Sequence, residues 1–278
     1  MSERITVSYF MQAKREGRPV TMLTAYDFPM ARLVDAAGID SILVGDSLGN
    51  VVLGYGSTIP VTMDDMVHHV KAVTRGVQRA LVVADMPFLS YHLSREESVR
   101  NAGRMLQEGG AQAVKLEGGQ EVAEAIKAMV TAGIPVVGHL GLTPQSVLTM
   151  GGYKVQGKDE AAARKLLDDA RAVQEAGAFA LVLECVPTPL ARLVTEKLDI
   201  TTIGIGAGPY CDGQVLVTHD LLGLYGGNSP KFVKRYANLN EDIMKALQSY
   251  GEEVGSRSFP GPEHGFSMSE EVIEKLKA

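Results

Sequence analysis

The sequence predicts an α/β fold in which eight parallel strands close into a (βα)8 TIM barrel, preceded by an N-terminal leader helix. Short, continuously apolar runs alternate with segments of helical spacing, as expected for strands buried on both faces. Several expected helices end in glycine just before the next strand, for example Ala37-Gly38 and Ala176-Gly177, which is typical of tight helix-to-strand turns. We expect one domain over residues 1–278, because α/β barrels of about 250 residues commonly form a single domain.

The expected elements follow one another in regular order. The leader helix covers residues 2–16, with Ile5, Tyr9 and Phe10 near one face. The expected strands are residues 20–24, 42–44, 81–84, 113–116, 135–138, 180–183, 202–205 and 214–218. The expected helices between them are residues 28–37, 62–75, 94–108, 120–131, 159–175 and 189–197. Thr62 and Asp65 form a variant of the capping box, and the remainder from Ser229 reads as helical with a proline-rich tail.

A doubly wound open sheet is the alternative fold. It is the weaker interpretation, because no G-x-G-x-x-G sequence follows the first expected strand. The barrel accounts for the same elements more economically, since eight successive strand–helix units are what a closed parallel barrel needs.

Composition and charge exclude several classes of protein. A net charge of −6 argues against general attraction to nucleic acid or anionic membranes. We see no signal peptide at the N-terminus and no run approaching the roughly 18 apolar residues of a membrane span. Cys185 and Cys211 form neither a disulfide framework nor a paired metal motif, and we interpret them as reduced thiols. We therefore expect a cytoplasmic protein that acts on small molecules.

Carboxylates follow three neighbouring strands at their expected C-terminal ends, which converge on one face of a barrel. Asp46 lies in Gly45-Asp46-Ser47 after the second strand, and Asp85 and Glu117 follow the third and fourth. Three close carboxylates repel one another unless a cation or protons intervene. All-oxygen ligation suits a hard divalent ion, Mg²⁺ first. The alternative is that each acid forms a structural ion pair at the barrel rim.

Three further strand-end residues are candidates for the same site. Lys115 precedes Glu117 by two residues, so both side chains face one side of the strand, where a cation would hold an anionic oxygen or a developing enolate. A simple pair between Lys115 and Glu117 is the alternative. His139 is suited to hydrogen bonding or proton transfer, although a single histidine is more often structural. Glu184, across the barrel from Asp46, is either a general base or a rim carboxylate held by backbone N–H groups.

Together these groups indicate enolate chemistry on a small oxo acid. A 2-oxo acid chelates Mg²⁺ through its carboxylate and keto oxygens, and the metal lowers the pKa of the adjacent C–H. A positioned base removes that proton, and the enolate attacks an electrophile that spacing and composition do not name.

Specific stretches run along nearly the whole chain, from Thr24 to Phe266. They include TAYDFPMA, LVGDSLGNVVLGY, VVADMPFLSY, AVKLEGG, VVGHLGLTPQSV, LVLECVP and FPGPEHGF. In these stretches the chain closely resembles the ketopantoate hydroxymethyltransferase (3-methyl-2-oxobutanoate hydroxymethyltransferase) family. The resemblance implies transfer of a hydroxymethyl group from 5,10-methylenetetrahydrofolate to 3-methyl-2-oxobutanoate. The product is 2-dehydropantoate, an intermediate of pantothenate biosynthesis, formed through a Mg²⁺-stabilised enolate.

The resemblance also implies roles for individual residues. Asp46, Asp85 and Glu117 would surround Mg²⁺, with Asp46 and Asp85 as direct ligands, and Glu184 would be the catalytic proton acceptor. The assembly implied is a homodecamer, a pentamer of dimers. The residues implied to bind the oxo acid are Asp46, Ser47, Asp85, Lys115 and His139.

Two other functions compete with this one. A Mg²⁺-dependent lyase or mutase of the phosphoenolpyruvate mutase–isocitrate lyase kind would carry a catalytic cysteine on a mobile loop, whereas Cys185 lies in apolar strand-end sequence. A barrel that only binds a ligand or serves assembly would be expected to lose its strand-end ionisable groups. Here those groups are intact.

Overall fold

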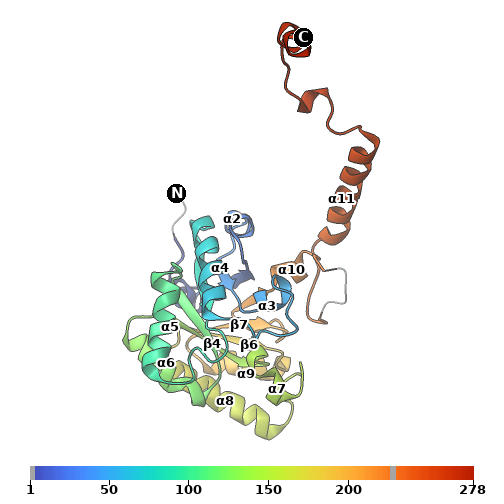
Figure 1. Ribbon diagram of the computed structural model, residues 1–278. Helices are drawn as coiled ribbons and strands as arrows, with labels where there is room; N and C mark the ends of the chain where they lie inside the picture. Colours follow the sequence, from blue (N-terminus) through green and yellow to red (C-terminus); the bar gives the residue numbers. More distant parts are fainter. Residues whose placement is uncertain (1–3, 226–229) are drawn as a thin grey trace. The chain divides into compact units, whose positions relative to one another are not determined.

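The computed structural model describes residues 4–225 and 230–278, and its eight parallel strands form a closed barrel (Figure 1). Each strand pairs with the next along the chain, and the eighth pairs with the first. The barrel prediction is therefore confirmed, and the open-sheet alternative is wrong. The strands are β1 Val20–Thr24, β2 Ser41–Val44, β3 Leu81–Asp85, β4 Ala113–Glu117, β5 Val136–Gly141, β6 Ala180–Glu184, β7 Thr201–Ile205 and β8 Gly213–Leu216.

The helices that cover the barrel are those expected from the sequence (Figure 1). The Thr62–Asp65 capping box is present at the start of α4, where Thr62 Oγ1 accepts from the Asp65 N–H and Asp65 Oδ2 accepts from the Thr62 N–H. The helices are α1 Val7–Arg15, α2 Phe28–Ala36, α4 Met63–Gly76, α5 Arg95–Gln107, α6 Ala123–Thr131, α8 Glu160–Glu175 and α9 Thr188–Lys197.

The sequence did not predict the short helices in the loops. Helices of three or four residues are too short to show a period of 3.6, so hydrophobic patterning cannot detect them. The eighth strand was expected to reach residue 218, but it ends at Leu216 and a helical turn begins at Thr218. These short elements are α3 Leu48–Val51, η2 Pro144–Ser146, α7 Val147–Met150 and α10 Thr218–Leu221; η1 Gln120–Val122 replaces the first turn expected of α6.

The barrel interior is built by alternate residues of each strand. Val20 and Met22 of β1, and Leu81 and Val83 of β3, pack in one apolar cluster. The intervening residues, such as Val82, belong to a second cluster that includes residues of the surrounding helices. Because side chains alternate across a strand, the next inward position after Val83 is Asp85. The same alternation in other strands brings polar side chains to the C-terminal end of the interior.

The leader helix α1 packs at the opposite, N-terminal end of the strands. Phe10 is fully buried and makes an edge-on contact with Phe179, the ring centroids being 5.3 Å apart. Thr201 Oγ1, at the start of β7, donates to the Phe10 carbonyl at 2.8 Å, and Lys14 Nζ contacts Asp212 Oδ2 at 2.8 Å. The prediction of a leader helix is confirmed over Val7–Arg15; residues 1–3 lie outside the described residues.

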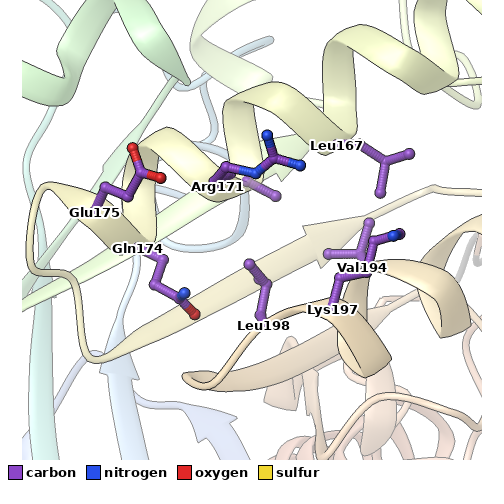
Figure 2. Close-up of a pocket in the computed structure, with 8 residues that line it drawn as sticks. Leu167, Arg171, Gln174, Glu175, Val194, Lys197 and Leu198 are labelled. Carbon is purple, nitrogen blue, oxygen red and sulfur yellow. The ribbon is translucent and has the colours of Figure 1, made fainter.

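A surface groove with a volume of about 300 Å³ lies between α8 and α9 (Figure 2). Leu167 and Leu198 supply apolar walls, and Arg171 and Lys197 supply charged ones. It is formed by helix residues on the outside of the barrel and shares no lining residue with the strand ends.

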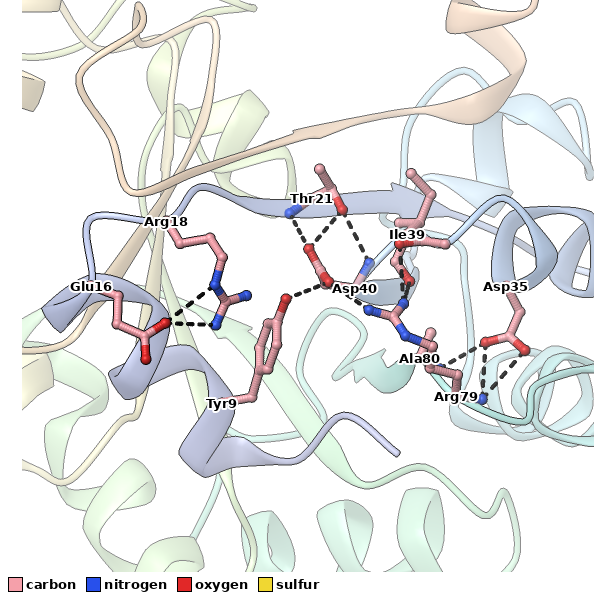
Figure 3. Close-up of polar contacts among 10 residues, drawn as sticks. Tyr9, Glu16, Arg18, Thr21, Asp35, Ile39, Asp40, Arg79 and Ala80 are labelled. Carbon is pink, nitrogen blue, oxygen red and sulfur yellow. Dashed lines mark hydrogen bonds and ion pairs between the residues drawn. The ribbon is translucent and has the colours of Figure 1, made fainter. Parts of the chain in front are cut away.

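Asp40 binds three parts of the N-terminal end together (Figure 3). Its Oδ1 accepts from Tyr9 Oη of α1 at 2.6 Å and from the Arg79 guanidinium at 3.0 Å. Its Oδ2 accepts from the N–H and hydroxyl of Thr21 in β1, at 3.0 and 2.8 Å. Although burial raises the pKa of Asp40, the hydrogen bonds from Tyr9, Thr21 and Arg79 outweigh it and lower that pKa below its usual value. Asp40 is therefore a carboxylate that stabilises the fold.

The chain groups into two compact units: the barrel with residues 229–234, and a second unit of residues 219–228 and 235–278. The second unit contains α11 Leu239–Ser256, η3 Pro262–His264 and α12 Glu270–Lys277, none of which buries a residue. Helix was expected from Ser229, which lies outside the described residues, but α11 begins only at Leu239. The single-domain expectation stays a prediction. No described helix is long and apolar enough to cross a membrane.

We expect Asp40→Ala to lower the free energy of unfolding by about 1–3 kcal/mol, because it leaves Tyr9, Thr21 and Arg79 without their acceptor. The folded-state pKa of Asp40 is lowered, so its contribution is present above the unfolded-state pKa and is lost as pH falls through the folded-state value. Urea unfolding should therefore show a smaller difference from the parent at about pH 3 than at about pH 7. Exposed Asp168→Ala is the control. An equal difference at both pH values contradicts the prediction.

Candidate active site

Ionisable side chains occupy the last inward positions of four neighbouring strands. Asp85, Lys115, His139 and Glu184 each lie two residues after an inward apolar residue, and Glu117 lies two residues after Lys115. The parallel register sets Asp85 beside Lys115 and Glu117 beside His139. Because successive inward positions of adjacent strands meet, the fold gathers these predicted residues at the C-terminal end of the barrel.

Lys115 is the buried cation of this cluster. Its Nζ lies 2.7 Å from Asp85 Oδ1, with both side chains at most 5% exposed, and 3.1 Å from His139 Nδ1. Burial alone lowers the pKa of Lys115, but the carboxylates of Asp85, Glu117 and Asp46 raise it above its usual value. Lys115 is therefore protonated. It pairs with Asp85 on the adjacent strand β3 rather than with Glu117 on its own strand β4.

His139 lies between two carboxylates. Its Nε2 is 3.3 Å from Glu184 Oε2, and its Nδ1 is 3.5 Å from Glu117 Oε1. Burial and the Lys115 ammonium lower the pKa of His139, but contacts with Glu117 and Glu184 outweigh them and raise it to about 9. An ammonium only donates, so a neutral ring accepts at Nδ1 and carries its hydrogen on Nε2. In both protonation states an N–H of His139 faces Glu184.

Asp46 follows β2 and is joined to the cluster through its backbone. The Asp46 N–H donates to Asp85 Oδ2 at 3.0 Å, and Asp46 Oδ2 accepts from Gln145 Nε2 at 2.8 Å. Burial raises the pKa of Asp46 well above its usual value, and the carboxylates of Asp85 and Glu117 raise it further. The pKa of Asp46 is therefore raised both by its burial and by the negative charge of its neighbours.

Gly45 and Ser47 define the turn that carries Asp46. A Cβ at Gly45 would lie 2.7 Å from Ser47 Oγ and 3.3 Å from Asp85 Oδ2, so a side chain there would displace the polar groups around it. Ser47 Oγ lies 2.9 Å from Tyr26 Oη, within hydrogen-bond distance. The turn therefore delivers one carboxylate and one hydroxyl to the same end of the barrel.

Sequence reasoning missed Gln145, which links four parts of the site. Its Nε2 donates to Asp46 Oδ2 at 2.8 Å and to the Met86 carbonyl at 2.9 Å, and its Oε1 accepts from Tyr91 Oη at 2.7 Å. Its backbone N–H donates to Glu117 Oε2 at 3.0 Å. A single amide in a loop gives no periodic signal, and Gln145 lies in η2, beyond the end of β5 at Gly141.

The backbone around Glu184 is tightly constrained. The Glu184 carbonyl accepts from the Leu142 N–H at 2.8 Å, and a Cβ at Gly141, whose φ is +96°, would overlap that carbonyl. Cys185, the next residue, has φ +49° although it is not glycine. Non-glycine residues in this region store strain and cluster at functional sites. The glycine and the turn at Cys185 together fix where the Glu184 side chain starts.

Asp46 and Asp85 have the chemistry that a magnesium ion requires. Mg²⁺ prefers oxygen ligands and is usually held by one or two carboxylates together with water and substrate oxygens. Burial and, after it, the carboxylates of Asp85 and Glu117 raise the pKa of Asp46, and a divalent cation would relieve the part that is due to repulsion. Among the described residues, no three His, Cys, Asp or Glu side chains are gathered closely enough to hold a metal. The residues fit a site with two carboxylates, and the metal roles of Asp46, Asp85 and Glu117 stay predictions.

A closed parallel barrel with a buried acid–base cluster at the C-terminal ends of its strands defines a TIM-barrel enzyme. The sequence model of ketopantoate hydroxymethyltransferase matches residues 4–262. The chain belongs to the ketopantoate hydroxymethyltransferase family. It is 59% identical over 273 residues to the 3-methyl-2-oxobutanoate hydroxymethyltransferase of Syntrophomonas wolfei, covering 98% of this chain and 99% of that one. It is 59% identical over 271 residues to the enzyme of the same name from Enterococcus faecalis, covering 98% of each.

Solved structures show the same fold in more distant proteins. Phosphoenolpyruvate phosphomutase from Streptomyces platensis has a TM-score of 0.62 at 16% identity, covering 98% of this chain and 94% of that one. Phosphonopyruvate hydrolase, solved with oxalate and Mg²⁺, has a TM-score of 0.59 at 13% identity with the same coverage. At these identities the similarity concerns the fold. The family match therefore favours the hydroxymethyltransferase interpretation over the lyase or mutase alternative.

We expect Gln145→Leu to lower the free energy of unfolding by about 1–3 kcal/mol, because it leaves buried polar atoms of Asp46, Met86 and Tyr91 without partners. Urea unfolding followed by circular dichroism measures the change. Gln156→Leu is the matched control, since the Gln156 side-chain amide donates to the nearby Lys154 carbonyl at 2.9 Å. Equal stability losses in the two variants would show that the Gln145 network does not contribute as described.

Proposed function

We propose that the protein transfers a hydroxymethyl group from 5,10-methylenetetrahydrofolate to 3-methyl-2-oxobutanoate, giving 2-dehydropantoate for pantothenate biosynthesis. The observation that carries this proposal is 59% identity, over 98% of the chain, to an enzyme named for the hydroxymethylation of this oxo acid. The buried cluster supports it, because it contains a cation, paired carboxylates and a candidate base.

Asp46 and Asp85 would hold Mg²⁺, with Glu117 beside them. When bound, the ion would supply Lewis-acid chemistry that makes the C–H next to the keto group more acidic. Asp46 and Ser47 would bind the oxo acid from the turn after β2, together with Asp85. These assignments are supported by the short backbone link from Asp46 to Asp85 and by the hydroxyl that Ser47 contributes.

Lys115 would stabilise the charge that develops on the substrate. Its ammonium is buried and fixed by Asp85, so it needs little reorganisation when an oxygen becomes negative. A dry, preorganised cation stabilises an enolate more strongly than the same cation in water.

Glu184 would accept the proton from C3 of the oxo acid. The C3–H bond breaks, its electron pair moves into the enolate, and the carboxylate of Glu184 becomes protonated. Water adds to the methylene carbon of the donor and its two C–N bonds break, which releases tetrahydrofolate and leaves the one-carbon unit at the oxidation level of formaldehyde. C3 forms a bond to that carbon, the C=O electron pair moves to its oxygen, and the proton held by Glu184 converts this oxygen to the hydroxyl of the product. His139 Nε2, 3.3 Å from Glu184 Oε2, would orient that carboxylate and stabilise its charged form.

Incubation of the protein with Mg²⁺, 3-methyl-2-oxobutanoate and 5,10-methylenetetrahydrofolate tests the proposal directly. We expect 2-dehydropantoate, identified by mass spectrometry, in amounts far above those of a mixture without protein. Failure to form it under conditions in which the protein is folded would refute the proposed function.

We expect Glu184→Gln to lower turnover at least about 100-fold, because the amide cannot accept the proton. Loss of a general base usually has an effect of this size. Exchange of the C3 proton of 3-methyl-2-oxobutanoate with D₂O, followed by NMR without donor, should fall by a similar factor. Mg²⁺ binding measured by calorimetry should persist. Retained exchange in this variant would contradict the base assignment.

We expect Asp85→Ala to weaken Mg²⁺-dependent binding of the oxo acid at least about tenfold, because one carboxylate ligand and the partner of Lys115 are lost. Calorimetric titration with 3-methyl-2-oxobutanoate, in the presence and absence of Mg²⁺, measures the effect. Asp35→Ala, at the N-terminal end of the barrel, is the control. A titration identical to that of the parent would rule out this role for Asp85.

We also propose a cytoplasmic homodecamer, built as a pentamer of dimers. Exposed apolar residues lie along one face of α11 in the single chain, and such faces commonly mark interaction sites. Sedimentation should give the mass of ten chains, with smaller species for Leu247→Glu and unchanged mass for Ser249→Glu on the same helix. A monomeric parent would contradict the proposal. The face comprises Ile243, Met244, Leu247, Tyr250 and Val254.

A further inference from the structure

The side-chain amide of Gln145 engages one particular oxygen of Asp46. Gln145 is 5% exposed, and its Nε2 donates to Asp46 Oδ2 at 2.8 Å. In the part of the chain that the structure describes, no group donates a hydrogen bond to the other oxygen of this carboxylate, Oδ1. The two oxygens are therefore not equivalent, because Oδ2 is bound within the protein and Oδ1 is available to a ligand of the site.

The orientation of the Gln145 amide is fixed by its two other partners. The Met86 carbonyl can only accept a hydrogen bond, and it lies 2.9 Å from Nε2. On the other side of the amide, Oε1 accepts from Tyr91 Oη at 2.7 Å, and this hydroxyl oxygen accepts from the Glu117 N–H at 3.2 Å. If the amide turned over, its oxygen would face two acceptors, the Met86 carbonyl and Asp46 Oδ2. The amide is therefore held as a donor to Asp46.

The neighbouring carboxylates are restrained in a similar way. Asp85 Oδ1 pairs with Lys115 Nζ at 2.7 Å, and Asp85 Oδ2 accepts from the Asp46 N–H at 3.0 Å. Glu117 Oε2 accepts from the backbone N–H of Gln145 at 3.0 Å. Each of the three carboxylates thus has at least one oxygen engaged within the protein. None of them can turn to offer both oxygens to a ligand without losing a buried hydrogen bond.

A carboxylate that offers a single oxygen suits a small cation better than a large one. Mg²⁺ requires oxygen ligands at about 2.0–2.1 Å in near-ideal octahedral geometry. Ca²⁺ takes about six to eight oxygens at about 2.3–2.6 Å, and carboxylates bind it through one oxygen or through both. Selectivity between these two ions depends on cavity size, ligand number and ligand flexibility. Restraint of Asp46 limits the last two.

We infer that Gln145 is a positioning residue that limits Asp46 to one available oxygen and thereby favours Mg²⁺ over Ca²⁺. The inference rests on the proposed function, in which Asp46 and Asp85 hold the metal. Tyr91 contributes indirectly, because it keeps the nitrogen of the Gln145 amide directed to Asp46. Loss of a group that orients a metal ligand typically lowers metal affinity or activity by about 10–100-fold.

Two substitutions test this role. Gln145→Met keeps the length of the side chain and the backbone N–H that binds Glu117, but it cannot donate to Asp46. Tyr91→Phe removes only the hydroxyl that orients the amide, so it tests the same role if Gln145→Met does not fold.

Each substitution has a matched control away from the site. Gln174→Met removes an amide whose Oε1 accepts from the Asp199 N–H at 2.7 Å on the outside of the barrel (Figure 2). Tyr9→Phe removes a tyrosine hydroxyl that donates to Asp40 at 2.6 Å at the N-terminal end. Both controls lose a native hydrogen bond without touching the carboxylates of the site.

Calorimetric titration of each full-length variant with Mg²⁺ alone, and with Ca²⁺ alone, measures the two affinities, and circular dichroism verifies folding. We expect Gln145→Met to weaken Mg²⁺ binding at least about tenfold and Tyr91→Phe at least about threefold. The affinity for Ca²⁺ should stay within about twofold of the parent, because Ca²⁺ tolerates a carboxylate that is free to turn. Neither control should change either affinity.

Equal losses of affinity for the two cations in a folded variant would indicate a purely structural role and overturn the inference. Unchanged Mg²⁺ affinity in folded Gln145→Met or in Tyr91→Phe overturns it as well, as does a parent that does not prefer Mg²⁺ over Ca²⁺. The titrations contain neither organic substrate. Failure to form 2-dehydropantoate therefore refutes the proposed function separately from the cation preference.

Discussion

The buried ammonium of Lys115 is the group on which the rest of the site depends. A charge removed from water costs several kcal/mol unless it is paired, and Asp85 supplies the pair at 2.7 Å. The acids around it outnumber it, because Asp46, Glu117 and Glu184 share the same end of the barrel. Lys115 therefore lowers the free-energy cost of burying several acids, although one ammonium does not neutralise all of them. The pKa of Asp46 is raised first by burial and then by the remaining repulsion from Asp85 and Glu117.

The N-terminal end of the barrel contributes stability, and the C-terminal end carries the ionisable groups of the candidate active site. At the N-terminal end, the carboxylate of Asp40 accepts hydrogen bonds from Tyr9, Thr21 and Arg79, and its pKa is lowered. At the C-terminal end, burial and the neighbouring carboxylates of Asp85 and Glu117 raise the pKa of Asp46. A carboxylate with a lowered pKa stabilises the folded state at neutral pH, whereas one with a raised pKa opposes it. The stabilising interactions at the N-terminal end thus offset the unfavourable electrostatic free energy of the carboxylates at the C-terminal end.

The sequence predicted the positions of the strands well, because short, continuously apolar runs between turn residues are typical of strands buried on both faces. Asp85, Lys115 and Glu184 could be placed in a common site because parallel barrels bring all strand ends to one face. The partner of Lys115 could not be predicted, because spacing within a strand favoured Glu117 while the register between strands delivered Asp85. Gln145 was missed for the same physical reason. Its importance lies in contacts with residues far away in sequence, and no local pattern encodes them.

The leader helix has a kinetic consequence. Phe10 and Phe179 pack edge-on in the apolar cluster that fills the barrel interior, and this cluster separates the groups around Lys115 from solvent at the N-terminal end. In a site that opens at one end only, the ligand that binds deeper must bind first and leave last. Under the proposed function, the small oxo acid would take the deeper position, beside Lys115, and the larger donor the position nearer to solvent. With the ligands so placed, the oxo acid would bind before the donor and its product would leave last.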